Sequence, residues 1–281
     1  MGIQIHEALV MGASHRWRSI NLDHAAGAEY IDPMKTFIFE GKTWRRAVHA
    51  LEGFWRGLPS RCAVCQGWPH SPLCETCVSQ FAQPQHRCNG CAMPLNPTQQ
   101  RCPDCLTHPP PLDLCLAAVP YAWPWVDLIA HFKFNEQAAW SSTLATLMLS
   151  TPWAEDTLEK ADFVLPIPLS PQRLAHRGYN QSWLLAQELC LHKANAQLLL
   201  RTRDTPSQRD LPRSERLANL NGAFAVEPLS AAKLRGKRVV LVDDVMTSGA
   251  SLHCAAKVLR QAGVVHISAL VLARTETRPL N

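Results

Sequence analysis

KRVVLVDDVMTSGAS, residues 237–251, combines an apolar run, an acid pair and a turn of small residues. The run RVVLV (238–242) has no polar interruption, which predicts a strand buried on both faces. Asp243 and Asp244 follow it directly. The turn after them consists of Thr247, Ser248, Gly249, Ala250 and Ser251. A buried strand that ends in polar residues and a small-residue turn is typical of a ligand site in an α/β protein.

The turn leads into a predicted helix, 251–262, which Gly263 ends. Successive backbone N–H groups at a helix N-terminus bind phosphate, and the helix dipole adds to the attraction. Gly249 allows close approach, and the neighbouring hydroxyls add donors. The acid pair repels phosphate but accepts hydrogen bonds from a vicinal diol. The stretch therefore predicts a ribose 5-phosphate site.

Strand and helix patterns alternate from residue 111 onward, after the proline-rich THPPPLD (107–113). The expected helices span 125–149 and 180–191, and the other expected strands span 162–168, 196–200 and 264–273. Strands separated by helices predict a parallel sheet with helices on both faces. We therefore expect an α/β domain over 111–281.

Eight of the 11 cysteines form four C-x-x-C knuckles. They are Cys62 and Cys65, Cys74 and Cys77, Cys88 and Cys91, and Cys102 and Cys105. Two knuckles complete one tetrahedral thiolate shell, so four predict two zinc ions. Disulfides are the alternative, but they suit a secreted chain. We expect the first knuckle to pair with the second and the third with the fourth; interleaved pairing is the other arrangement.

The knuckles lie in a short segment, 56–110, that is poor in apolar residues, so metal must stabilise it. With four thiolates for each ion, the sites are expected to be structural rather than catalytic. Three histidines nearby are expected to be solvent-facing loop residues: His70, His86 and His108. Three further cysteines are expected to be buried, inert thiols: Cys115, Cys190 and Cys254.

Bulk properties exclude several classes of protein. The chain has 281 residues, of which 47% are hydrophobic, and a net charge of +5. It contains no run of roughly 18 apolar residues and no secretory pattern at its N-terminus, so we expect a cytoplasmic protein without membrane insertion. Residues 1–55 read as an N-terminal extension that is poorly ordered up to about residue 33, and Met34 offers an internal start.

Residues 239–251 resemble the phosphoribosyl pyrophosphate (PRPP) motif of type I phosphoribosyltransferases, with T-S-G-A-S in place of T-T-G-x-T. Two simpler interpretations are a solvated Asp-Asp turn and a Walker B strand. A Walker B strand requires a Walker A loop, G-x-x-x-x-G-K-[ST], elsewhere in the chain. The G-K-T at 41–43 does not form one, because Thr36 stands where the motif requires its first glycine.

Blocks upstream extend the resemblance over roughly residues 56–275. P-x-P precedes R-G-Y-N-Q at 177–181, and Gln208, Leu211 and Arg216 form a Q-x-x-L-x-x-x-x-R block. With the four knuckles, these blocks resemble the ComF family, which includes GntX. The resemblance implies a double zinc ribbon followed by a type I phosphoribosyltransferase-like domain.

The same resemblance implies that PRPP binds with Mg²⁺, which bridges the pyrophosphate. It places Arg173 and Arg177 near the pyrophosphate, and Arg209, Arg213 and Arg216 on or beside a mobile hood. A solvated basic surface is the simpler alternative for each arginine. Asp243 and Asp244 would supply the negative charge that an oxocarbenium-like state at C1′ requires.

Two functions follow. The first is a protein that binds PRPP or a related ribose phosphate and supports DNA uptake, natural transformation or the use of DNA as nutrient. Its further partners would be single-stranded DNA and proteins of DNA uptake or recombination. The alternative is an active phosphoribosyltransferase that transfers ribose 5-phosphate to a nitrogenous acceptor.

Overall fold

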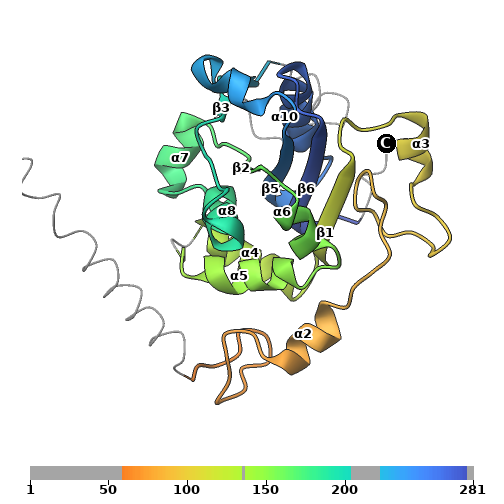
Figure 1. The fold of residues 1–281 in the computed structure, drawn as a ribbon. Coiled ribbons are helices and arrows are strands. Elements are labelled where there is room, and N and C mark those ends of the chain that lie inside the picture. The colour runs from red at the N-terminus through yellow and green to blue at the C-terminus, as the bar shows by residue number, and fades with distance from the viewer. Residues whose placement is uncertain (1–58, 135–136, 204–221, 277–281) are drawn as a thin grey trace, which may run out of the picture. The chain divides into compact units, whose positions relative to one another are not determined.

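The computed structural model describes residues 59–134, 137–203 and 222–276 (Figure 1). The expected extension, 1–55, and the hood residues Arg209, Arg213 and Arg216 lie outside these ranges. The described strands are β1 (Leu114–Pro120), β2 (Phe163–Pro166), β3 (Leu199–Arg201), β4 (Phe224–Val226), β5 (Arg238–Met246) and β6 (His266–Arg274).

The described helices are short, and none of them is long and apolar enough to cross a bilayer. They are α2 (Glu75–Phe81), α3 (Pro103–Thr107), α4 (Trp125–Phe134), α5 (Trp140–Leu149), α6 (Ala154–Glu159), α7 (Pro171–Arg177), α8 (Gln181–Cys190), the 3₁₀ helix η2 (Pro228–Leu234) and α10 (Ala250–Gln261).

Four strands form a parallel sheet in the order β1-β6-β5-β2. The central strands β5 and β6 are almost entirely buried, as their runs of valine, leucine and alanine predict. Alternate residues of each strand point to opposite faces, and both faces are covered. The expected parallel sheet is therefore confirmed.

Each face of the sheet has its own core. Leu241 and Val271 pack with Leu259 of α10 on one face. Val240 and Leu270 pack on the other face with residues of α4, α5 and α8, including Leu185. Figure 1 shows α10 and the pair α5 and α8 in this arrangement around the sheet. Because helices cover both faces of the sheet, a ligand can reach it only at the ends of the strands.

Two expectations about elements were wrong, and one strand was missed. The helix expected over 125–149 is two helices, because a new turn forms at Gln137, whose backbone carbonyl accepts from the N–H of Trp140. The strand expected over 196–200 begins at Leu199 and pairs antiparallel with β4, outside the main sheet. Strand β1 was missed, although LCLAAVP alternates buried and half-buried positions as an edge strand does.

Strand β5 is longer than the predicted 238–242 and continues through the acid pair to Met246. Its pairing with β6 includes Asp243 opposite Val271 and Met246 opposite Arg274. Its pairing with β2 ends at Val242, opposite Pro166. The acid pair therefore lies one step beyond the carboxyl end of β2, where α/β sheets bind their ligands.

Candidate functional site

The two carboxyl groups at the end of β5 differ in their surroundings. Asp243 is half-buried, and its Oδ1 accepts from the Ser182 hydroxyl at 2.9 Å and from the Asp244 amide at 3.0 Å. Burial, followed by the charge of Asp244, raises the pKa of Asp243 from 3.8 to about 7, against the opposing effect of Lys133. Asp243 therefore exchanges its proton near neutral pH.

Asp244 is buried and is paired with a cation that sequence reasoning missed. Its Oδ1 lies 3.0 Å from the Nζ of Lys133, and both side chains are largely shielded from water. Lys133 lies near the C-terminal end of α4, more than a hundred residues away in sequence. The HFKFN stretch around it carries no separate signal, because one lysine at the end of an amphipathic helix is normally solvated.

The R-G-Y-N-Q block holds the end of α4 in place. Tyr179 donates its hydroxyl to the backbone carbonyl of Phe132 at 2.5 Å. Gln181, which is buried, donates to the carbonyl of Lys133 at 3.4 Å. The Arg177 guanidinium lies 5.3 Å from the centre of the Phe134 ring and donates to Gln181 at 3.0 Å. The block thus positions Lys133 beside Asp244.

The turn between β5 and α10 has the expected form. Gly249 is the N-cap of α10, with φ of +78°, a left-handed conformation that favours glycine. A Cβ there would lie 2.5 Å from Cε of Met246 and 3.1 Å from Nε2 of His253. The left-handed backbone therefore favours glycine here, and any larger residue would also displace the Met246 side chain beneath the turn. Thr247 is exposed, Ser248 and Ser251 are half-buried, and Ala250 is buried.

The two predicted arginines that the structure describes lie on or at the end of α7. Arg173 is half-buried, and its backbone N–H donates to the hydroxyl of the N-cap Ser170 at 3.4 Å. Arg177 contacts Phe134 and Gln181. Its guanidinium is thus occupied in supporting α4, which the sequence did not predict.

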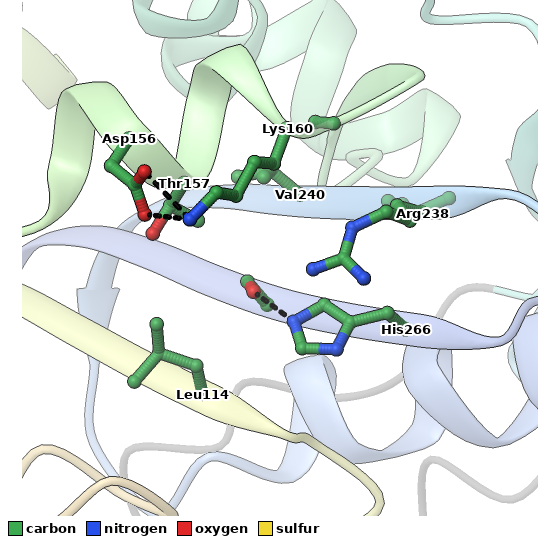
Figure 2. A pocket seen from close by; sticks show the side chains of 10 residues that line it. Leu114, Asp156, Thr157, Lys160, Arg238, Val240 and His266 are labelled. Carbon is green, nitrogen blue, oxygen red and sulfur yellow. Dashed lines mark hydrogen bonds and ion pairs between the residues drawn. The ribbon is translucent and has the colours of Figure 1, made fainter.

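A pocket of about 180 Å³ opens at the amino ends of the strands, opposite the end that carries the acid pair (Figure 2). Arg238, His266 and Leu114 line it, and they are the first residues of β5, β6 and β1. The Nε2 atom of His266 lies 3.2 Å from the Ser268 hydroxyl, and burial, followed by Arg238, lowers the pKa of His266. Because this pocket lies at the amino ends of the strands, it is separate from the acid pair.

The eight knuckle cysteines form two clusters in the predicted sequential pairing. Cys62, Cys65, Cys74 and Cys77 make the first cluster, and Cys88, Cys91, Cys102 and Cys105 make the second. The sulfurs within a cluster lie within 4.8 Å of one another. The Sγ atoms of Cys65 and Cys74 are 3.8 Å apart, and those of Cys91 and Cys102 are 3.6 Å apart. A tetrahedral zinc with Zn–S bonds of about 2.3 Å separates its sulfurs by about 3.8 Å, so both clusters fit zinc.

Backbone amides stabilise thiolates in both clusters. Burial opposes ionisation of Cys62, but amide hydrogen bonds outweigh it and lower the pKa to about 6. Burial and neighbouring thiols raise the pKa of Cys77 to about 12. In the second cluster, Cys88 accepts from the N–H of Cys102 at 3.2 Å, whereas burial raises the pKa of Cys91 to about 11. Four thiols in one site ionise together only around a cation, which is the role that zinc takes.

The remaining histidines and cysteines near the clusters mostly behave as predicted. His70, His86 and His108 are exposed, and both clusters consist of cysteine alone. Cys115 and Cys254 are buried, and burial raises the pKa of each. Cys190 is a correction: it is only partly buried and lies 3.7 Å from the His192 ring nitrogens, because it is the last residue of α8.

Comparison with known proteins gives the same picture as the geometry. Residues 201–281 match the family model described as the phosphoribosyl transferase domain. The chain is 35% identical over 223 residues to competence protein F of Haemophilus influenzae, an alignment that covers 76% of this chain and 96% of that protein. The chain belongs to the competence protein F (ComF) family.

A second relative of this ComF-family chain is the DNA utilization protein YhgH of Escherichia coli strain CFT073. The two are 31% identical over 227 residues, which are 78% of this chain and 98% of that protein. A solved structure of the allosteric regulatory enzyme of purine biosynthesis aligns with a TM-score of 0.31 at 20% identity, and the alignment covers 48% of this chain and 25% of that one. The ComF assignment therefore rests on the sequence relatives.

Elemental analysis should find two zinc ions per chain, one for each cluster. Cys62→Ser and Cys102→Ser should each lose one ion, because a shell of three thiolates and one hydroxyl binds zinc far more weakly. His70→Ala is the control and should keep both ions. One zinc in the wild-type protein would contradict the sequential pairing.

Asp243→Asn should change the pH dependence of stability. A carboxyl whose pKa is raised on folding contributes most below its unfolded pKa of 3.8, and the contribution is lost as pH rises through about 7. The variant should therefore gain a few degrees of melting temperature relative to wild type at about pH 8, and less at about pH 5.

Asp162→Asn is the matched control for this prediction. Amide and Lys237 hydrogen bonds lower the pKa of Asp162, so its contribution is lost only as pH falls below the usual range of a carboxyl. Its effect should be constant between about pH 5 and about pH 8. Equal pH profiles for the two variants would contradict the raised pKa of Asp243.

Proposed function

We propose that this ComF-family protein binds PRPP, or a related ribose phosphate, with Mg²⁺ at the end of β5 and supports the uptake or use of DNA in the cytoplasm. In this proposal the ribbons occupy 56–110 and the phosphoribosyltransferase-like domain occupies 111–281. The observation that carries it is the acid pair, Asp243 and Asp244, beside a turn that a left-handed glycine shapes at the N-terminus of α10.

The parts of the site match the parts of the ligand. The N–H groups of residues 248–251 and the hydroxyls of the turn suit the 5-phosphate. The two carboxyl groups suit the ribose diol. Lys133, already held beside Asp244, supplies a cation within reach of the pyrophosphate. Asp243 and Asp244 keep negative charge near C1′, where positive charge would develop if the glycosidic bond to pyrophosphate broke.

The names of the relatives, competence protein F and DNA utilization protein, support a role with DNA. A groove of about 330 Å³ offers a surface for it, between the first cysteine cluster and the helices α4 and α5. Trp123 and Trp140 line this groove together with Gln66 and Gln137. Trp123 is 64% exposed, and its ring packs edge-to-face with the Phe81 ring, with 5.0 Å between the ring centroids. Trp140 is partly buried, so Trp123 is the ring best placed to stack on an unpaired base, with amide groups beside it.

An active phosphoribosyltransferase is the alternative function. The raised pKa of Asp243 favours it, because carboxyl groups that titrate near neutral pH often take part in catalysis. Release of pyrophosphate from PRPP in the presence of free bases or single-stranded DNA would establish the enzyme. Tight binding of PRPP without release would establish a sensor or adaptor.

PRPP with Mg²⁺ should stabilise the folded protein in a thermal melt. At about 100 times Kd the gain is roughly 2.7 kcal/mol. Gly249→Val should abolish the shift, because the side chain would collide with Met246 and the backbone would leave its left-handed conformation. Asp244→Asn should reduce it, since the pair with Lys133 is weakened.

Gly236→Val is the matched control for Gly249→Val. Gly236 also has a left-handed φ, +73°, but a Cβ there meets nothing within 4 Å. It should lower the melting temperature and keep the full PRPP shift. A folded wild-type protein without any PRPP shift would overturn the proposed ligand.

Trp123→Ala should weaken the binding of a labelled oligothymidylate roughly tenfold in fluorescence anisotropy, because one stacked base is lost. Trp153→Ala is the control, since Trp153 is 72% exposed at the N-cap of α6 and does not line the groove. Equal affinities for the two variants would show that the groove is not a base-stacking surface.

A further inference from the structure

A buried arginine joins the second cysteine cluster to the candidate ligand turn. Arg274 is the last residue of β6 and is only 7% exposed. Its Nε donates to the backbone carbonyl of Cys91 at 2.8 Å. One of its terminal nitrogens donates to the carbonyls of Met246, at 3.1 Å, and of Thr247. One guanidinium thus holds a cysteine knuckle and the first residue of the turn in a fixed geometry.

A second set of contacts connects the same two regions. The backbone N–H of Cys115 donates to the carbonyl of Asn89, which lies inside the third knuckle, at 2.7 Å. The Cys115 thiol lies 3.5 Å from the sulfur of Met246. Met246 in turn packs directly beneath Gly249, where an added Cβ would lie 2.5 Å from its terminal methyl. The second cluster therefore supports the turn from beneath as well as through Arg274.

The first cluster makes different contacts. Phe81, at the end of α2, accepts a hydrogen bond at its carbonyl from the indole of Trp125 at 3.0 Å. Val64 and Phe81 pack against the core that α4, α5 and α8 form. These contacts are made on the face of the sheet that α4, α5 and α8 cover, and not at the β5–α10 turn. The two clusters thus support different parts of the domain.

We infer that Arg274 is a positioning residue, which fixes the backbone of Met246 and Thr247 against the knuckle of Cys88 and Cys91. The turn Thr247–Ser251 keeps its binding conformation only while the second cluster is intact. Loss of metal from that cluster releases the Cys91 carbonyl, frees the guanidinium and loosens the turn. The identity of the ligand rests on the proposed function, but the coupling between cluster and turn does not.

Arg274→Met tests the inference in the full-length, zinc-loaded protein, because it keeps an unbranched apolar side chain similar to the aliphatic part of arginine and removes every donor. Zinc content should remain at two per chain by elemental analysis. Two backbone amides donate to carbonyls at the turn, Thr275 to Met246 and His253 to Gly249. Both should exchange with deuterium at least about tenfold faster, and affinity for PRPP with Mg²⁺ should fall about tenfold. Arg274→Lys should lie between this variant and wild type.

Arg260→Met is the matched control. Arg260 also donates to two backbone carbonyls, those of Val264 and Val265, but at the amino end of β6. Exchange in the turn should stay within about twofold of wild type. Cys102→Ser should loosen the turn as Arg274→Met does, whereas Cys62→Ser should not. If Cys102→Ser fails to fold, the comparison of Arg274→Met with Arg260→Met still tests the inference.

Wild-type exchange rates in the turn of Arg274→Met would overturn the inference, and so would equal effects of the two arginine variants. The exchange measurement requires no ligand, so it separates this inference from the proposed function. A wild-type protein that does not bind PRPP, but whose turn loosens in Arg274→Met and not in Arg260→Met, would refute the ligand and support the coupling.

Discussion

Two adjacent carboxyl groups at the end of a buried strand are the constraint on which the surrounding structure depends. Unpaired charge in such a position is costly, because burial removes the solvation that stabilises it. The protein compensates in two ways: Lys133 pairs with Asp244, and the Ser182 hydroxyl donates to Asp243. Both partners come from helices on the same face of the sheet. The placement of α4 and α8 is therefore tied to the acid pair.

The R-G-Y-N-Q block is best understood from the same constraint. Tyr179 and Gln181 bind backbone carbonyls at the end of α4, and Arg177 covers the Phe134 ring. These contacts stop α4 from fraying where its lysine must reach the carboxylate. The lysine and the hydrogen bonds offset only part of the cost of burying the Asp243 charge, since the pKa of Asp243 remains raised, to about 7. An incompletely stabilised charge at a strand end is typical of a site that gains its last partners from a ligand.

The cysteine clusters solve a different problem. Their segment has too few apolar side chains for a core of its own, and tetrahedral thiolate shells replace it. The second cluster is more than an appendage, because its buried cysteines join the core of the α10 face and Arg274 binds its knuckle. Residues 59–276 of this ComF-family protein thus carry two cysteine clusters that fit zinc, the acid pair with its glycine turn, and a groove lined by two tryptophans.

Local patterns were enough to predict much of this protein. The sequential pairing of the knuckles, the strands β2, β5 and β6, and the glycine turn into α10 follow from spacing and period, which act over a few residues. The longer extent of β5, the division of 125–149 into α4 and α5, and the antiparallel pairing of β3 depended on neighbours elsewhere in the chain. The pair of Lys133 with Asp244 and the bond from Arg274 to Cys91, 183 positions apart, were decided by tertiary packing alone. A side chain's sequence neighbours determine its backbone conformation, but its charge partner is whichever group the folded sheet brings within hydrogen-bond distance.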